Sequence, residues 1–161
     1  MTYEEAVESI MPGLYRHFKG NYYRVLSIAR HSETTEPMVV YQALYGNYSI
    51  WIRPADMWNE TVERDGKATR RFHPLSRIER VSFYELIYDE VRSASHETSA
   101  SREEMSLKVR ALDEYYVSGE WKKDYEADEA GLFPADLKRG VLSQDGLYNF
   151  LMTWKAEDGK Q

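Results

Sequence analysis

The spacing of the apolar residues changes near Pro74, and this change constrains the fold more than any other feature of the chain. Before Pro74, short runs of β-branched and aromatic residues alternate with turn residues, a pattern typical of β-strands. After it, apolar residues recur every three or four positions, which predicts helices. We therefore expect an α+β protein, with a small SH3-like β-barrel over residues 11–73 followed by an α-helical bundle domain over residues 74–161. Residues 1–10 would form an N-terminal leader, itself a candidate helix.

The β-rich half contains five candidate strands separated by residues that favour turns. In the run 38–45, both alternating faces are largely apolar, as expected where a tightly curved sheet closes on itself or is covered by another element. Five short strands in about sixty residues indicate a small barrel. Residues 54–58 are typical of a single helical turn that begins with proline. The predicted strands cover residues 13–18, 22–29, 38–45, 49–53 and 67–72.

Two capping boxes mark the expected helix starts in the second half. In each, a serine hydroxyl can accept a backbone amide three residues later, while a glutamate at that position accepts the serine amide. Ser76 and Glu79 form the first box, and Ser101 and Glu104 form the second. Ser143 is predicted to cap the last helix. The expected buried stripes are Ile78, Val81, Tyr84, Tyr88, Val91 and Ala94 in the first helix, and Leu147, Leu151 and Trp154 in the last.

The composition excludes several classes of protein. A hydrophobic content of 42% with 14% aromatic residues is enough to build a core. The absence of cysteine excludes disulfides, thiolate metal sites and cysteine nucleophiles, and we expect a cytoplasmic protein. No run of about 18 apolar residues is present, so we expect no membrane span. Residues 1–11 lack a basic segment and contain three glutamates, which argues against a signal peptide.

The net charge of −6 is carried by the second half of the chain. Residues 74–161 contain twelve Lys and Arg against eighteen Asp and Glu, whereas residues 11–73 contain nine against six. An acidic second half would repel nucleic acid at long range. We therefore expect no binding of duplex nucleic acid, and only the barrel could face a phosphate.

A polar string from Arg30 to Thr34 lies between two predicted strands. Arg30 could form charge-assisted bonds to a phosphate or carboxylate, and the Ser32 hydroxyl could donate another, beside His31 and Glu33. Loops on a rigid barrel are common binding sites. In the alternative interpretation, the string is a polar hairpin loop whose side chains satisfy nearby backbone amides. Spacing alone favours this second interpretation.

Trp51 and Arg53 form a second candidate site. They would point outward if Ile50 and Ile52 point into the barrel. A tryptophan followed two residues later by an arginine can stack a planar ligand and bond its polar edge, as in the recognition of nucleobases. Alternatively, Trp51 covers the barrel against the helical half, and Arg53 pairs with an acidic helix residue. The candidate site also includes two nearby rings, Tyr41 and Tyr45.

His17 precedes the turn at Gly20 and Asn21 and lies near Lys19. Its imidazole could help to bind an anion, or act as a base near neutral pH. In the alternative interpretation it is a strand residue with a single hydrogen bond. We therefore treat it as a candidate ligand-binding residue.

Two lookalikes of metal sites are incomplete. His96 and Glu97 resemble the first half of a zinc-binding helix motif, but Ala100 stands where the second histidine is required. Asp124 begins an acidic run that resembles a calcium loop, but Glu129 occupies the glycine position. We expect this run to be a solvated surface. No metal and no cofactor is predicted.

Four ordered segments stand out in the first half: Pro12–Gly20, Ala29–Thr34, Val40–Gly46 and Trp51–Pro54. Over residues 11–72 they resemble the bacterial domain-of-unknown-function family 1653. The second half contains Tyr115-Tyr116, Gly119–Trp121, Asp124–Glu129 and Leu137–Ser143. Over residues 77–157 these resemble domain-of-unknown-function family 4298. The resemblance implies a fusion of two families without established activity. It implies no substrate. It does make the polar residues of the first half stronger candidates for a functional role than their spacing alone does.

The leading hypothesis is a non-enzymatic binding module for a polar or phosphorylated ligand, with a nucleotide or short RNA as the first candidate. The second is a small enzyme for a nucleotide-like or acyl substrate, in which His31 or His17 is the general base and Arg53 stabilises developing negative charge. No catalytic residue is assigned beyond this alternative. The third is a protein–protein adaptor, favoured if Trp51 is buried. The expected partner is accordingly a small molecule, a nucleotide or a protein.

Overall fold

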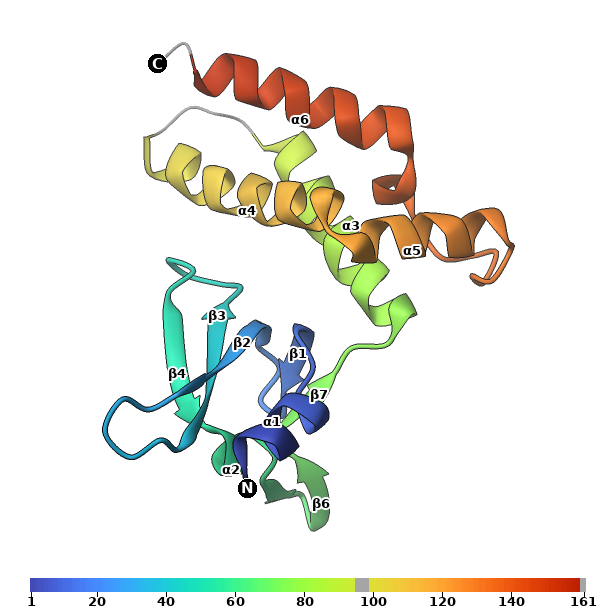
Figure 1. Cartoon of the computed structure of the whole chain (residues 1–161). Coiled ribbons are helices and arrows are strands. Elements are labelled where there is room, and N and C mark those ends of the chain that lie inside the picture. The colour runs from blue at the N-terminus through green and yellow to red at the C-terminus, as the bar shows by residue number, and fades with distance from the viewer. Residues whose placement is uncertain (95–98, 160–161) are drawn as a thin grey trace. The chain divides into compact units, whose positions relative to one another are not determined.

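A computed structural model describes residues 1–94 and 99–159, with side chains for residues 1–94 and 102–159 (Figure 1). The chain separates into two compact units, Met1–Leu75 and Ser76–Gln161. The first is rich in strands and the second is helical, so the α+β fold class is confirmed. In the part of the chain described, no helix is both long and apolar enough to cross a membrane.

The first unit is built on an antiparallel five-stranded sheet with the strand order β4-β3-β2-β1-β7. A separate two-stranded hairpin, β5-β6, follows a single-turn helix, and a short helix precedes the first strand. The elements are α1 (Tyr3–Ser9), β1 (Gly13–His17), β2 (Tyr22–Arg30), β3 (Pro37–Ala43), β4 (Ile50–Pro54), α2 (Ala55–Trp58), β5 (Thr61–Arg64), β6 (Lys67–Arg70) and β7 (Phe72–Pro74).

The predicted barrel is present only as an incomplete one, because β4 and β7 are the two edges of the sheet and do not pair with each other. The sheet nevertheless curls, since the Arg53 guanidinium on β4 lies 5.8 Å from the ring centroid of Phe72 on β7. An irregularity between Val25 and Ser27 in β2 strengthens the local twist. Side chains therefore bridge the gap that hydrogen bonds would close in a complete barrel.

An aromatic stack fills the core of this unit. The Trp58 ring of α2 lies parallel to the Phe72 ring, with centroids 3.8 Å apart. Tyr15 and Tyr41 meet Trp58 edge-on, at 5.3 and 5.0 Å. The remaining members of the core cluster are Ala6, Ile10, Val25, Val39 and Ala55.

One predicted strand is divided. The run 67–72 was expected to close the barrel, but its first part, β6, pairs with β5 outside the main sheet. The reason lies at Asp65 and Gly66, which both have positive φ, as the tightest hairpin turns require. The strands beside this turn are almost wholly exposed, so β5 lacks the apolar alternation by which strands are recognised.

The second unit contains four α-helices and a short 3₁₀ turn among its described residues. Its first capping box is confirmed: the Glu79 amide donates to the Ser76 hydroxyl at 3.2 Å, and the Ser76 amide donates to Glu79 at 2.8 Å. The second box is wrong, because the helix begins at Ser99 and Ser101 therefore lies inside it. The zinc-motif lookalike begins at His96 and Glu97, outside the described residues. The elements are α3 (Arg77–Ser93), α4 (Ser99–Val117), α5 (Gly119–Glu129), η1 (Gly140–Leu142) and α6 (Gln144–Asp158).

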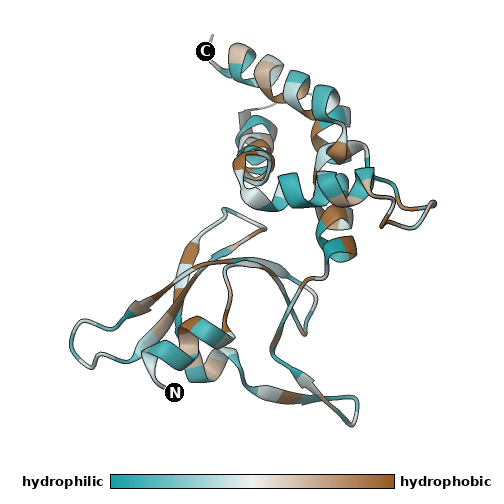
Figure 2. Cartoon of the chain, turned by 45° about the vertical axis from the view of Figure 1, so that its right-hand side comes forward, coloured by the Kyte–Doolittle hydropathy of each residue, from teal (hydrophilic) through white to brown (hydrophobic). Residues whose placement is uncertain are grey.

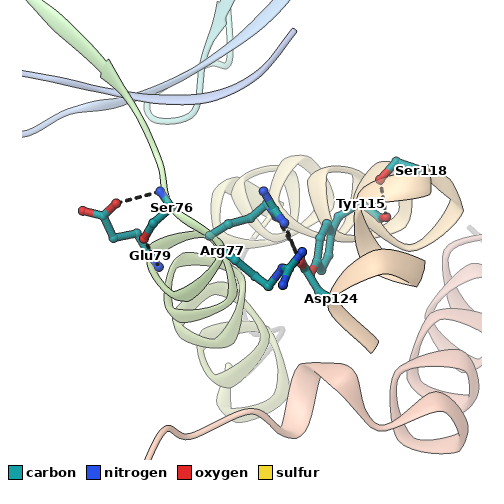
Figure 3. Close-up of polar contacts among 7 residues, drawn as sticks. Ser76, Arg77, Glu79, Tyr115, Ser118 and Asp124 are labelled. Atoms are coloured by element: carbon teal, nitrogen blue, oxygen red, sulfur yellow. Dashed lines mark hydrogen bonds and ion pairs between the residues drawn. The ribbon is translucent and has the colours of Figure 1, made fainter. Parts of the chain in front are cut away.

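A buried ion-pair network joins three of these helices (Figure 3). Asp124 on α5 is fully buried, so the expectation that its acidic run is a solvated surface was wrong at this residue. Arg80 of α3 contacts the carboxylate with two nitrogens, one of them at 2.8 Å, and Arg77 lies 3.6 Å away. The Tyr115 hydroxyl of α4 donates to it at 2.6 Å. Burial, and then the charge of Asp124, raise the pKa of Tyr115.

Candidate ligand-binding site

The strand register decides which face of the sheet carries Trp51 and Arg53. Trp51 is paired with Tyr41, and Arg53 with Val39. Residues directly opposite each other on neighbouring strands share a face, so Trp51 and Arg53 lie on the inner face, with the core. Ile50 and Ile52 alternate with them along β4 and therefore lie on the outer face. The condition for an outward-pointing Trp51 and Arg53 is therefore not met, since Ile50 and Ile52 do not point into the barrel and are 61% and 62% exposed.

Six rings gather on the inner face, and we call this group the aromatic face. Tyr23 is at its centre, with ring centroids 5.6 Å from those of Tyr41, Tyr45 and Phe72. The hydroxyls of Tyr23 and Tyr45 are 2.8 Å apart, and burial together with this contact raises the pKa of Tyr23 to about 12. The Tyr23 phenol is therefore neutral at physiological pH. The members of the aromatic face are His17, Tyr23, Tyr41, Tyr45, Trp51 and Phe72.

Part of the aromatic face is open to solvent. Trp51 is 56% exposed and Tyr45 is 45% exposed, whereas Tyr41 and Phe72 are buried. Large exposed rings on a surface that is otherwise packed provide stacking area for a planar group. A stacking surface therefore continues directly from the core.

Arg53 is the charged group beside these rings. Its guanidinium lies over Phe72, and its Nε is buried without a hydrogen-bond partner. Within the residues described, Arg53 makes no ion pair and no hydrogen bond. Buried polar groups are usually paired, so an unpaired arginine donor requires an explanation. Here the terminal nitrogens of the guanidinium keep their donor hydrogens available for an anionic ligand.

His17 connects the aromatic face to the neighbouring basic residues. Its ring centroid is 4.8 Å from that of Phe72, and its Nδ1 accepts the Lys19 amide at 3.3 Å. Burial lowers the pKa of His17 below 6.5, and the charges of Arg71, Lys19 and Arg53 lower it further. The imidazole is therefore neutral at pH 7 and adds no positive charge of its own.

This shift predicts a measurable pH dependence. A histidine with a pKa below 6.5 in the folded state binds protons less tightly there than in the unfolded chain. Its contribution to stability is therefore complete above about pH 6.5 and is lost as the pH falls towards the folded-state value. We expect NMR titration of the His17 ring to give a midpoint below 6.5, and Arg53→Ala to raise that midpoint. Arg30→Ala is the control, and an equal response to both substitutions would contradict the placement of Arg53 beside His17.

The polar loop from Arg30 to Glu33 is held by local contacts. The Nδ1 atom of His31 accepts the amides of Glu33 and Thr34, each at 3.3 Å. The Arg30 guanidinium pairs with Glu4 at 3.3 Å and lies 4.0 Å above the Tyr3 ring of α1. Figure 2 shows the loop as a hydrophilic projection from the sheet. These contacts are the ones expected of a polar hairpin loop whose side chains satisfy nearby backbone amides.

The structure thus separates the predicted residues into two groups. His17, Tyr41, Tyr45, Trp51 and Arg53 belong to one face of the sheet. Arg30 is the last residue of β2, and the loop residues His31, Ser32 and Glu33 follow it. The strand between the two histidines has nine residues, which corresponds to roughly 30 Å when extended. His17 and His31 therefore do not share a site.

Two members of the aromatic face were not selected from the sequence. Tyr23 is the second residue of β2, and Phe72 is the first residue of β7. Tyr23 lies two residues before Val25, which pairs with Tyr41, so it shares their face. Only the register of β2 against β3 supplies that information.

The comparisons with known proteins follow the division into two units. A solved structure described as "Crystal structure of a protein belonging to DUF1653 from Bordetella bronchiseptica" is 38% identical, covering 43% of this chain and 91% of that chain, with a TM-score of 0.41. The family model described as "Protein of unknown function (DUF1653)" matches residues 13–74. The chain belongs to the DUF1653 family. The model "Domain of unknown function (DUF4298)" matches residues 83–157.

The expected fusion of the two families is therefore confirmed. A search of the curated proteins found no match. Every residue of the aromatic face, and Arg53, lies inside the range matched by DUF1653. Both family descriptions state that the function is unknown, so no activity can be transferred to the DUF1653 domain or to the DUF4298 domain.

Proposed function

We propose that the DUF1653 domain is a non-enzymatic binding module whose aromatic face takes a planar, negatively charged ligand of the nucleotide class. The observation that carries this proposal is Arg53, a guanidinium without a hydrogen bond or ion pair among the described residues. It lies on the same strand and the same face as the half-exposed Trp51. An available cation beside an available ring is the combination that a nucleotide requires.

Each part of a nucleotide has a counterpart in this arrangement. A base can stack on Trp51 or Tyr45, since any base offers a π-face to an exposed ring. A phosphate can accept two parallel hydrogen bonds from Arg53, because the planar guanidinium matches its geometry. The hydroxyls of Tyr23 and Tyr45 can bond the polar edge of the base. The surface is neutral apart from Arg53, which favours one phosphate over a duplex backbone.

The arrangement supports binding better than catalysis. A histidine acting as general base needs a group to orient it, commonly a carboxylate. Among the described residues, no carboxylate bonds to His17, whose Nδ1 accepts a backbone amide instead. His31 uses its Nδ1 to hold its own loop. The described residues also contain no group of three or more His, Cys, Asp or Glu that could hold a metal ion.

Calorimetric titration of the full chain with UMP tests this proposal. We expect saturable binding that Trp51→Ala weakens by about 5- to 150-fold, which corresponds to 1–3 kcal/mol of stacking on one base. Arg53→Ala should weaken it by about tenfold or more, because a charge-assisted hydrogen bond is lost. Arg30→Ala is the matched control, since that guanidinium is already committed to Glu4 and Tyr3. Absence of binding, or equal losses in the Arg53 and Arg30 variants, would refute the proposal.

A further inference from the structure

A groove of about 590 Å³ lies in the DUF1653 domain, next to the aromatic face. One wall is the β5-β6 hairpin, and the other is formed by β1 and β7. A volume of this size is within the usual range of small-ligand sites. The polar side chains used in the argument below are Arg16, His17, Arg64, Lys67, Thr69 and His73, all of which line the groove.

The strand registers give each wall its chemistry. On the hairpin, Arg64 is paired with Lys67, and Thr69 is two residues further along the same strand. Side chains two apart on a strand share a face, so all three point to one side of the hairpin. On the opposite wall, Arg16 of β1 is paired with His73 of β7. Cationic side chains thus enter the groove from both walls.

The groove has an excess of positive charge. Arg16, Arg64 and Lys67 contribute three cations, against the one carboxylate of Asp65. That carboxylate is 93% exposed and 3.9 Å from Arg64, so it compensates little of the charge. Within the described residues, neither the Lys67 ammonium nor the Thr69 hydroxyl makes a hydrogen bond. These two groups remain free to donate to an anion.

Two contacts hold the groove in place and join it to the proposed site. Arg64 donates to the carbonyl of Phe18, which ties the hairpin to the turn after β1. His17 lines the groove, and its ring also packs against Phe72 and Tyr23 of the aromatic face. The basic groove therefore begins where the stacking surface ends.

We infer that the groove holds backbone phosphates of a single-stranded nucleic acid whose base stacks on the aromatic face. This inference rests on the proposed function and names its ligand as an oligonucleotide instead of a mononucleotide. Stacking on protein rings requires unpaired bases, which selects a single strand over a duplex. The Lys67 ammonium and the Thr69 hydroxyl then bond successive phosphate oxygens, and Arg16 supplies further positive charge.

Comparison of UMP with a uridine hexanucleotide tests this inference, by fluorescence anisotropy or calorimetry on the full chain at several salt concentrations. We expect the hexanucleotide to bind more tightly. Lys67→Ala should weaken hexanucleotide binding and reduce the steepness of its salt dependence by about 0.7 in the log–log slope, the value for one phosphate contact on a single strand. It should leave UMP binding unchanged, whereas Trp51→Ala should weaken both ligands.

Arg70→Ala is the matched control, because it removes one positive charge from the same strand. Arg70 is adjacent to Thr69 and therefore points to the other side of the hairpin. The inference would be overturned if UMP and the hexanucleotide bind with equal affinity and if Lys67→Ala and Arg70→Ala have the same effect on hexanucleotide binding. The proposed function would then still stand. Binding of neither ligand would overturn both. Hexanucleotide binding that depends on Lys67 but not on Trp51 would refute the inference that one ligand occupies both the groove and the aromatic face.

Discussion

Replacing Asp124 with alanine is expected to destabilise the helical unit by about 3–5 kcal/mol, because it leaves buried partners without their counter-charge. The carboxylate has no solvent exposure and accepts hydrogen bonds from Arg80 and Tyr115. Hydrogen bonding to Asp124 raises the pKa of Arg80 in the native chain. An arginine guanidinium is charged even without such a partner, because its ordinary pKa is above about 12, so Arg80 stays charged when the carboxylate is removed. A charged, largely buried arginine without a partner carries most of the expected cost.

Urea unfolding of the full chain, followed by circular dichroism at 222 nm, measures this loss. Asp113→Ala is the matched control, since Asp113 pairs with Lys155 on the surface at 2.8 Å. An exposed pair of this kind contributes about 0–1 kcal/mol. Arg80→Ala should cost a similar amount to Asp124→Ala, and the double variant should cost less than the sum of the two. If Asp124→Ala costs no more than Asp113→Ala, the network does not hold the three helices together.

Replacing Trp58 with alanine is expected to cost about 3–5 kcal/mol in the stability of the DUF1653 domain. Trp58 is 1% exposed, stacks on Phe72 and meets Tyr15 and Tyr41 at its edges. Its removal would open a cavity at the centre of the curled sheet. Trp58→Phe should cost much less, because a phenyl ring keeps the stack with Phe72. The indole N–H that it removes has no hydrogen-bond partner in the described structure.

Trp51→Ala is the control for this prediction, since it changes the same residue type on the same unit. Trp51 is largely exposed, so we expect its loss to change the free energy of unfolding by no more than about 0.5 kcal/mol. The same variant should strongly weaken UMP binding, so the two tryptophans separate stability from ligand recognition. Equal destabilisation by Trp51→Ala and Trp58→Ala would contradict the burial that the fold assigns to them.

The helix starts at Ser76 and Ser143 could be predicted because a cap depends on residues that are close in the chain. The Ser76 hydroxyl and the Glu79 carboxylate complete their hydrogen bonds within three residues, whatever packs around them. Ser143 likewise accepts the Gly146 amide at 3.3 Å. The buried stripe of the last helix, from Leu147 to Trp154, follows from helical spacing for the same reason.

The candidate site was predicted only in part. The sequence could select Trp51 and Arg53 as neighbours on one strand face, since alternate residues always share a face. It could not determine which face, because hydrophobicity favours burial of Ile50 and Ile52, and both are exposed in the structure. The pairing of Trp51 with Tyr41 decides this, and that pairing depends on the turn between β3 and β4.

Local sequence therefore determined the two halves of this protein, most strand positions and the helix caps, because each depends on spacing and on hydrogen bonds over a few residues. Tertiary structure alone decided that Asp124 is buried and that Arg53 remains unpaired. The partners of Asp124 are 44 residues away at Arg80 and 9 residues away at Tyr115. The surroundings of Arg53 come from β1, β3 and β7, which only the curled sheet brings together. Contacts between distant segments set the charge and exposure of a group, and no local pattern contains them.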